Sequence, residues 1–252
     1  MARMTGKIAL VTGGGGGIGR SVAELFAAEG ACVTVAEIRT EAGAEVAERI
    51  NAAGGRAQFV QTDVTDPDSV ALAVERTVAA FGGLTVLYNN AGGENQNDST
   101  LTEVTLDHFW KTIKLDLFGT FLCSRLAIPA MRASGGGSIV NTTSMTALMG
   151  RPNRTAYTAA KGGVLAMTRS MAVEYADDHI RVNAIAPTRT LTDRVIQKNR
   201  DQPERAAYGN SLLLGAAEPI DIAYAAVYLA SDETRVMTGQ TIVVHSDYRR
   251  GA

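Results

Sequence analysis

Five consecutive glycines, residues 13–17, separate the apolar run 8–11 from residues 18–26, whose apolar side chains recur at helical spacing. Glycine loses more entropy on ordering than any other residue, so such a run alone is typical of a flexible linker. Between a strand and a helix, bare backbone instead lets the chain turn tightly and lets a pyrophosphate touch the main chain. The position of the run therefore favours a dinucleotide-binding turn, with the phosphate charge stabilised by the first N–H groups of the helix.

An acidic residue indicates which dinucleotide this turn would hold. Glu37 ends the second apolar run, 20 residues after Gly17, where a carboxylate would accept hydrogen bonds from an adenosine ribose and repel a 2′-phosphate. No lysine or arginine lies between Thr12 and Gly19. These features favour NAD over NADP. Arg39 keeps NADP open, and its other interpretation is a solvated charge at a helix entry.

Short β-branched runs alternate with helical segments along the whole chain. Their continuous apolar character predicts strands covered on both faces, and the alternation predicts an α/β fold with a parallel sheet. One helix is predicted over residues 67–81, with Asp66 as N-cap and Pro67 at the first helical position. No linker divides the chain, so we expect a single domain over residues 1–252. The predicted strands are 8–11, 32–36, 58–61, 85–88, 138–142, 180–185 and 241–244.

The longest helical stretch runs from about residue 103 to residue 131 and carries an apolar stripe. We interpret most of the stripe as packed on the sheet, and pairing of a second apolar face with a neighbouring subunit is an additional possibility. The stripe consists of Leu106, Trp110, Ile113, Leu117 and Phe121.

Composition excludes several functional classes. The formal net charge is -2 over 252 residues and no basic run occurs, which disfavours a nucleic-acid or anionic-membrane surface. The two cysteines and three histidines show no metal-ligand spacing, so no metal site is expected. The N-terminus has no signal-peptide pattern and no apolar run approaches a membrane span. We therefore expect a soluble, cytoplasmic protein.

Several motifs, taken together, resemble the short-chain dehydrogenases/reductases, in their single-domain branch of about this length. The resemblance covers nearly the whole chain and implies a Rossmann, doubly wound, seven-stranded parallel sheet with helices on both faces, usually assembled as a homotetramer or dimer. The motifs, in the family's order, are TGGGGGIG (12–19), DVTD (63–66), NNAG (89–92), SIVNTTS (138–144), YTAAK (157–161), RVNAIAP (181–187) and SDETRVMTGQTIVV (231–244).

The resemblance also implies roles for individual residues. Ser144, Tyr157 and Lys161 match the family's catalytic residues, and Asp116 stands beside them in the long helix. Asp63 would hold the adenine amine and Val64 would pack on its ring, while the residues from Pro187 onward would hold the nicotinamide carboxamide. The implied coenzyme-binding residues are Gly13, Gly16, Gly17, Ile18, Gly19, Glu37, Asp63, Val64, Asn90, Ala91, Gly92, Thr142, Tyr157, Lys161, Pro187, Thr190 and Thr192.

The spacing of Tyr157 and Lys161 suits proton transfer. A free tyrosine, with a pKa near 10, is a poor base at neutral pH. Lys161 follows four residues later on the same helix face, and its ammonium, together with an oxidised nicotinamide, would favour the phenolate. Tyr157 could then take a proton from an alcohol or return it to a reduced ketone. Ser144 would hydrogen-bond and position the substrate oxygen.

The sequence departs from the family pattern at Asp116, where asparagine is usual and helps to hold a water linked to the lysine. An ionised Asp116 would add negative charge near Lys161. Our hypothesis is that Tyr157 is then acidified less and the oxidative pH optimum moves upward. Thr188 replaces a glycine beside the nicotinamide site, and VHSD (244–247) replaces the usual VDGG.

The substrate pocket is expected to form from the variable segments 93–98, 145–154 and the substrate-binding loop at about 188–214. They mix apolar and polar residues, compatible with an apolar or aromatic secondary alcohol or ketone that carries one polar or anionic group. The favoured function is an NAD-dependent alcohol dehydrogenase/ketone reductase. Two alternatives stay open, an NADP-dependent 3-oxoacyl-thioester reductase and a catalytically impaired NAD-binding regulatory protein. The named pocket residues are Met145, Leu148, Met149, Leu212, Leu213, Gln96, Asn97, Arg151, Arg154 and Arg189.

Overall fold

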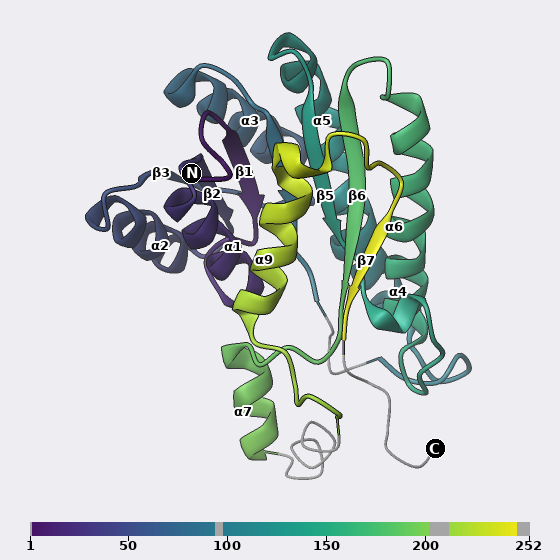
Figure 1. The fold of residues 1–252 in the computed structure, drawn as a ribbon. Helices are drawn as coiled ribbons and strands as arrows, with labels where there is room; N and C mark the ends of the chain where they lie inside the picture. Colours follow the sequence, from purple (N-terminus) through teal and green to yellow (C-terminus); the bar gives the residue numbers. More distant parts are fainter. Residues whose placement is uncertain (1, 94–97, 202–211, 246–252) are drawn as a thin grey trace.

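The computed structural model describes residues 2–93, 98–201 and 212–245. Seven parallel strands form one sheet in the order β3-β2-β1-β4-β5-β6-β7 (Figure 1). Each predicted strand is present, which confirms the doubly wound Rossmann arrangement. The strands are β1 (Ile8–Thr12), β2 (Cys32–Glu37), β3 (Arg56–Gln61), β4 (Val86–Asn89), β5 (Gly137–Thr142), β6 (Ile180–Pro187) and β7 (Thr241–Val244).

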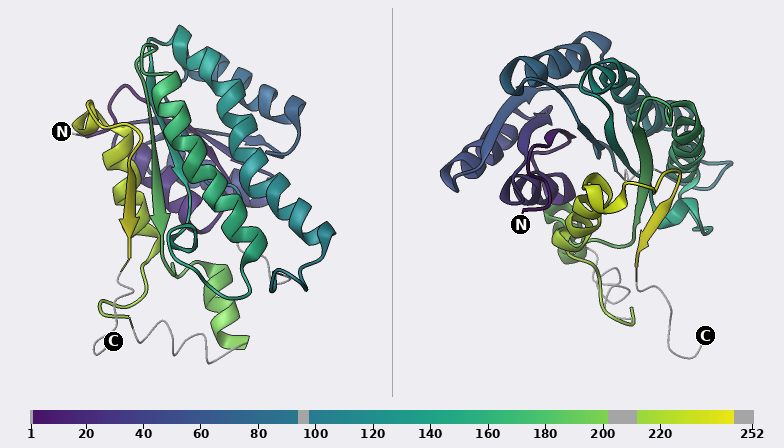
Figure 2. Two further views of the ribbon diagram at one scale, coloured as in Figure 1. Left: turned by 90° about the vertical axis from the view of Figure 1, so that its right-hand side faces the viewer. Right: turned by 45° about the horizontal axis from the view of Figure 1, so that its top comes forward.

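Helices cover both faces of the sheet (Figure 2). Within β1, Ala9 and Val11 enter one apolar core and Leu10 enters the other, because successive side chains of a strand point to opposite faces. One face is covered by α1 (Gly17–Ala28), α2 (Thr40–Ala52) and α9 (Pro219–Ala230), and the other by α3 (Pro67–Phe81), α5 (Gly119–Ala133) and α6 (Thr155–Glu174). Among the described residues no helix has both the length and the apolar character that a bilayer crossing requires.

Helix α3 has the predicted bounds and the predicted start. The Asp66 carboxylate accepts a hydrogen bond from the Asp68 N–H, and Pro67 occupies the first turn, where its missing N–H costs nothing. Gly82 ends the helix with φ +88°, a left-handed conformation that favours glycine.

The predicted long helix is continuous but changes its winding in the middle. It consists of α4 (Leu106–Thr112), a π-helical turn, η1 (Ile113–Phe118), and α5. The Gly119 N–H bonds to the Lys114 carbonyl, five residues back, which marks the wider turn. Such turns insert an extra residue and redirect neighbouring side chains, and here the turn contains Asp116.

The apolar stripe on this long helix faces solvent at its ends. Leu106, Trp110 and Phe121 are 78%, 63% and 42% exposed, so packing on the sheet is wrong for these three residues. The face that packs on the sheet is instead offset, with Leu122 and Cys123 buried in the core. The two middle members of the stripe are partly buried.

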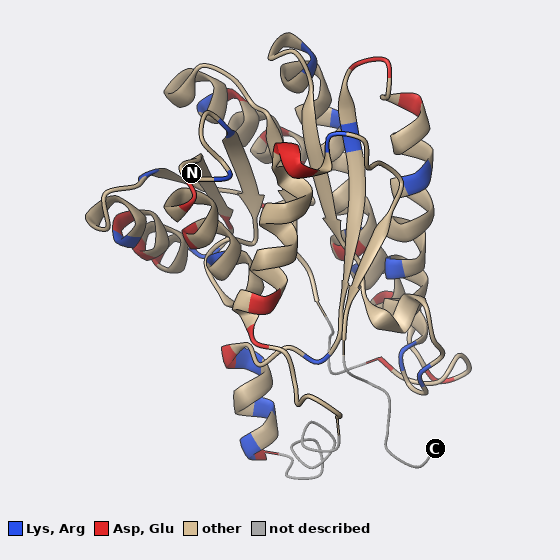
Figure 3. Ribbon diagram, in the orientation of Figure 1, with Lys and Arg blue, Asp and Glu red and all other residues tan. Residues whose placement is uncertain are grey.

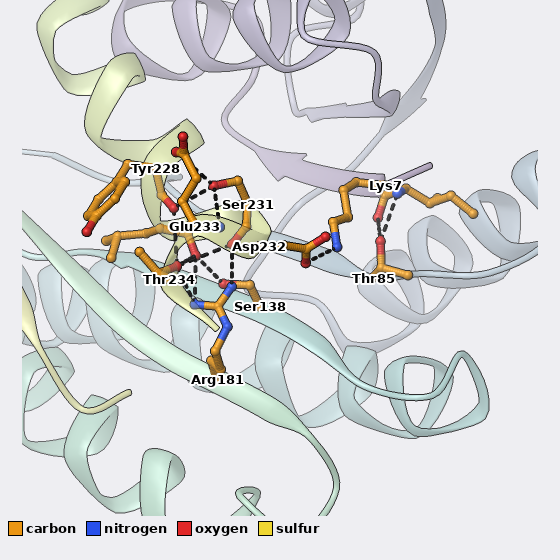
Figure 4. A network of polar contacts seen from close by, with 11 residues as sticks. Lys7, Thr85, Ser138, Arg181, Tyr228, Ser231, Asp232, Glu233 and Thr234 are labelled. Atoms are coloured by element: carbon orange, nitrogen blue, oxygen red, sulfur yellow. Dashed lines mark hydrogen bonds and ion pairs between the residues drawn. The ribbon is translucent and has the colours of Figure 1, made fainter. Parts of the chain in front are cut away.

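A polar network holds the amino ends of three strands to the C-terminal end of α9 (Figure 4). The Arg181 guanidinium, at the start of β6, donates to the Leu229 carbonyl at 3.0 Å, the Ser231 carbonyl at 3.0 Å and the Thr234 hydroxyl at 2.8 Å. Lys7, just before β1, pairs with Asp232 in η3 (Asp232–Thr234). The network lies at the edge of the sheet opposite to the carboxyl ends of the strands.

Replacing Arg181 with methionine should lower the free energy of unfolding by about 2–3 kcal/mol, because buried carbonyls lose a charged donor. Urea titration followed by circular dichroism measures this loss. Arg235→Met, which removes an exposed guanidinium near the same network, is the matched control. Equal unfolding midpoints for the two variants would contradict a structural role for Arg181.

Candidate active site

The glycine turn follows β1 and leads into α1, at the carboxyl edge of the sheet. The strand order reverses direction between β1 and its neighbour β4, and open α/β sheets bind ligands at such a position. Gly13 and Gly17 have φ +62° and +50°. A Cβ at Gly13 would lie 2.9 Å from the Ala91 Cα, and a Cβ at Gly19 would collide with the Gly13 carbonyl oxygen. Helix α1 begins at Gly17. The bare backbone and the helix start form a cradle that fits a dinucleotide, as the sequence predicted.

Glu37 lies against this turn. Its carboxylate is buried and accepts hydrogen bonds from the Gly15 N–H at 3.0 Å and from the Arg39 N–H at 3.2 Å. The exposed Arg39 side chain, at the N-cap of α2, also pairs with Glu37 at 3.1 Å. The structure therefore places Glu37 against the glycine turn and gives Arg39 an acidic partner there.

Hydrogen bonds join the glycine turn to the end of β4. The Asn90 side chain donates to the Thr12 and Gly13 carbonyls, each at 3.2 Å. The Thr12 hydroxyl accepts from the Asn90 N–H at 2.9 Å and from the Ala91 N–H at 3.1 Å. The side-chain amide of Asn90, a residue predicted to line the coenzyme crevice, thus stabilises the conformation of the glycine turn.

Tyr157 and Lys161 lie one turn apart near the start of α6. The Lys161 ammonium is 5.8 Å from the centre of the Tyr157 ring. Lys161 is only 2% exposed, and its Nζ donates to the Thr142 carbonyl at the end of β5 at 3.0 Å. The sheet therefore fixes the amine beside the phenol, as the spacing predicted.

Asp116 provides the counter-charge for this buried amine. Its Oδ1 lies 3.1 Å from Lys161 Nζ and accepts from the Gly93 N–H at 2.8 Å. Asp116 is 1% exposed, and its backbone carbonyl accepts from the Thr120 hydroxyl at 3.1 Å. A Cβ at Gly92 would collide with the same Oδ1, so the glycine is required for this approach.

Two opposing effects set the protonation of Lys161. Burial favours the neutral amine, but the Asp116 carboxylate and the Tyr157 side chain outweigh it and hold the pKa of Lys161 above its ordinary value. The amine therefore carries its positive charge through the neutral pH range. An asparagine at position 116 could hydrogen-bond the amine but could not supply this charge.

Ser144 lies just beyond β5, at the N-cap of the short helix η2 (Met145–Ala147). Its hydroxyl oxygen accepts from the Thr146 N–H at 3.2 Å and from the Thr146 hydroxyl at 2.9 Å. Helix η2 packs against α6, so Ser144 and Tyr157 come from adjoining elements. With both acceptor positions of Ser144 engaged, its own O–H can still donate a hydrogen bond.

The other predicted coenzyme-binding residues lie at or just beyond the carboxyl ends of strands, or in the first turn of α1. Val64 is buried and would touch a Cβ at Gly119, while Asp63 accepts hydrogen bonds from the N–H and hydroxyl of Thr65. Contacts of both residues with adenine stay predictions. The remaining members of this group are Ile18, Pro187, Thr190 and Thr192.

Parts of the predicted substrate pocket lie outside the described residues, namely Gln96, Asn97 and residues 202–211 of the substrate-binding loop. The last two residues of the VHSD segment also lie outside them. Of the described apolar pocket residues, Leu148 and Leu213 are exposed and Leu212 is buried.

One residue at the site was missed by the sequence analysis. Helix α6 begins after Arg154, which makes no side-chain cap. Asp98, 58 residues before Ala156, supplies the cap: its Oδ1 accepts from the Ala156 N–H at 3.2 Å and its Oδ2 accepts from the Tyr157 N–H at 2.9 Å. The buried carboxylate thereby fixes the helical turn that carries Tyr157. The lack of a capping residue before residue 155 was the available signal.

Comparisons with known proteins agree with this geometry. The family profile described as enoyl-(acyl carrier protein) reductase matches residues 13–247. The cis-4-hydroxycyclohexanecarboxylate dehydrogenase of Sinomonas cyclohexanicum is 40% identical over 243 residues, 96% of this chain and 96% of that protein. The cyclohexanol dehydrogenase of Acinetobacter sp. (strain SE19) is 35% identical over 246 residues, 98% and 96% of the two chains. A solved 7 alpha-hydroxysteroid dehydrogenase, complexed with NADH and 7-oxo glycochenodeoxycholic acid, has a TM-score of 0.91 at 31% identity, covering 100% of this chain and 97% of that chain.

Replacing Asp98 with asparagine should lower the free energy of unfolding by about 2 kcal/mol, because one charged acceptor becomes an amide donor facing an N–H. Hydrogen exchange of the first turn of α6 should become faster, which mass spectrometry of the peptide covering 154–161 measures. Asp107→Asn, at an exposed pair with Lys111, is the control. Unchanged exchange in that peptide would rule out capping by Asp98.

Proposed function

Because the chain belongs to the short-chain dehydrogenase/reductase family, and is therefore an NAD(P)-dependent oxidoreductase of alcohols and ketones, we propose that Tyr157 is its general acid/base and NAD its coenzyme. The observation that carries the assignment of Tyr157 is the buried ammonium of Lys161, 5.8 Å from its ring. The ammonium lies beside Gly92, and the two residues before it, Asn90 and Ala91, hydrogen-bond to the glycine turn that can hold a dinucleotide.

The proposed mechanism divides the work among a few side chains. The Lys161 charge favours the phenolate of Tyr157, which takes the alcohol proton during oxidation and returns it during reduction. The Ser144 hydroxyl positions the substrate oxygen. The backbone of the turn and the start of α1 hold the coenzyme phosphates. A bound nicotinamide supplies the hydride acceptor or donor.

The preference for NAD is supported by Glu37. A buried carboxylate hydrogen-bonded to the Gly15 N–H places negative charge where a 2′-phosphate would approach. Arg39, the residue that favours NADP, is already paired with that carboxylate. The solved 7 alpha-hydroxysteroid dehydrogenase, complexed with NADH, is consistent with this preference.

We propose a ring-bearing secondary alcohol or the corresponding ketone as the substrate. Relatives that match 96% and 98% of this chain are dehydrogenases named for a hydroxycyclohexanecarboxylate and for cyclohexanol. The first alternative, reduction of 3-oxoacyl thioesters with NADP, has support in the printed description of the family profile. The second, an impaired regulatory protein, is not favoured by the geometry, because Lys161 Nζ stays 5.8 Å from the centre of the Tyr157 ring while it pairs with Asp116.

We further propose a cytoplasmic homotetramer or dimer. The exposed apolar residues Leu106, Trp110 and Phe121 lie on one continuous helical run, a surface that a second copy of the chain would cover.

The function is tested with Tyr157→Phe. Reduced-nicotinamide absorbance should show wild-type oxidation of cyclic secondary alcohols with NAD, at a higher kcat/KM than with NADP. Loss of the phenol oxygen should lower kcat by about 10²–10⁴-fold, because proton transfer loses its base, while NAD binding is retained. Tyr224→Phe, at an exposed tyrosine on α9, serves as the control. Full activity of Tyr157→Phe refutes the mechanism, and better turnover with NADP refutes the coenzyme assignment.

Asp116→Asn tests the influence of the carboxylate on the phenol. Removing a negative charge next to Lys161 makes a phenolate beside it more favourable, so the acidic limb of the oxidation rate profile should move to lower pH, by about one unit. The profile of kcat/KM against pH measures this shift, with exposed Asp68→Asn as the control. An unmoved limb would show that Asp116 does not influence proton transfer.

A further inference from the structure

The first turn of α7 (Asp193–Asp201) and the residues just before it cross the carboxyl edge of the sheet (Figure 1). A Cβ at Gly17 would lie 2.9 Å from Thr192 Cγ2, so the segment touches the glycine turn. Asp193 pairs with Arg20 of α1 at 3.5 Å. The next residue, Arg194, reaches past the turn to the end of β4.

The guanidinium of Arg194 lies against Gly93. A Cβ at Gly93 would collide with Nη2 and would lie 3.2 Å from both Cζ and Nη1. Gly93 has φ +128° and bonds through its N–H to Asp116. The preceding residue, Gly92, adjoins Asp116 and Lys161: a Cβ there would lie 3.6 Å from Lys161 Nζ. Arg194 therefore lies one residue away from the proposed proton-transfer site.

This guanidinium has free hydrogen-bonding capacity. Throughout the ranges that the structure describes, no hydrogen bond or ion pair engages Arg194, and the side chain is exposed. Two acids of the described ranges that lie near it are paired with other residues, Asp116 with Lys161 and Asp193 with Arg20. Figure 3 shows several basic positions along α7, beyond the carboxyl ends of the strands. The guanidinium fork matches a carboxylate in a bidentate geometry.

We propose that Arg194 recognises a carboxylate on the substrate, so that the substrate is a secondary alcohol or ketone that is also a carboxylic acid. The inference rests on the proposed function. The other anion at this edge would be the coenzyme diphosphate, for which the chain already provides the N–H groups of the glycine turn and the start of α1. Arg194 lies beyond that turn, against Gly93, on the side of the catalytic residues.

The experiment compares an acid with its neutral analogues. Rates with NAD are measured for 4-hydroxycyclohexanecarboxylate, its methyl ester and cyclohexanol, in the wild type and in Arg194→Met, Arg194→Lys and Arg200→Met. The last variant removes an exposed guanidinium from the same helix without touching Gly93. Thermal denaturation and the NAD dissociation constant, from quenching of protein fluorescence, show that each variant is folded and binds coenzyme.

The wild type should prefer the acid to its ester. Arg194→Met should lower kcat/KM for the acid by about 10–100-fold, mainly through KM, because charge-assisted hydrogen bonds are lost. The same variant should leave the ester and cyclohexanol unaffected, with Arg194→Lys intermediate and Arg200→Met like the wild type. The NAD dissociation constant should not change.

Three results would overturn the inference alone. The first is an equal loss for the acid and the ester in Arg194→Met, and the second is a wild type that oxidises the neutral alcohols but does not prefer the acid. The third is a weakened NAD affinity of Arg194→Met that accounts for the loss, which would assign Arg194 to the coenzyme. A folded wild type that binds NAD but oxidises none of these alcohols overturns the proposed dehydrogenase function, and the inference with it.

Discussion

The structure of the candidate active site depends on keeping the buried ammonium of Lys161 charged. Removing Lys161 from water without partners would cost several kcal/mol or drive the amine to its neutral form. Three elements prevent this: the end of β5 presents the Thr142 carbonyl, the π-helical turn presents Asp116, and α6 carries the lysine itself. A shift in any one of these elements would leave a buried charge without its partner. The contacts of Lys161 therefore constrain how the three elements pack together.

The ion pair also changes the electrostatics that the phenol experiences. With a neutral amide at position 116, the ammonium would act on Tyr157 as an uncompensated charge. Here the Asp116 carboxylate, 3.1 Å from Nζ, offsets part of that field while holding the amine protonated. Lys161 therefore stays charged over a wider pH range but attracts a phenolate less strongly. Aspartate in place of asparagine at position 116 therefore keeps Lys161 charged and, at the same time, weakens the effect of that charge on Tyr157.

The parts of the structure that could be predicted from the sequence are local in the chain. The seven strands, the glycine turn and the one-turn spacing of Tyr157 and Lys161 each depend on neighbours a few residues apart, so periodicity and spacing predict them. The catalytic role of that pair was implied by the resemblance to the family and not by its spacing alone. The cap of α6 could not be found this way, because Asp98 precedes Ala156 by 58 residues and only the folded sheet edge joins them. The exposed stripe was misjudged for a related reason: helical spacing shows that Leu106, Trp110 and Phe121 share a face, but not whether that face meets the sheet.

The consecutive glycines Gly92 and Gly93 show how closely the two sides of the site approach. A side chain at Gly92 would displace Asp116, and a side chain at Gly93 would displace Arg194. Both residues have φ beyond +120°, which favours glycine independently of the space available. The Gly93 N–H also donates a hydrogen bond to the Asp116 carboxylate. The end of β4 therefore separates the buried pair of Lys161 and Asp116 from the exposed guanidinium of Arg194, which makes no hydrogen bond or ion pair within the described part of the chain. Because neither glycine carries a side chain, the proposed proton-transfer site and the proposed anion-binding guanidinium can lie within one residue of each other.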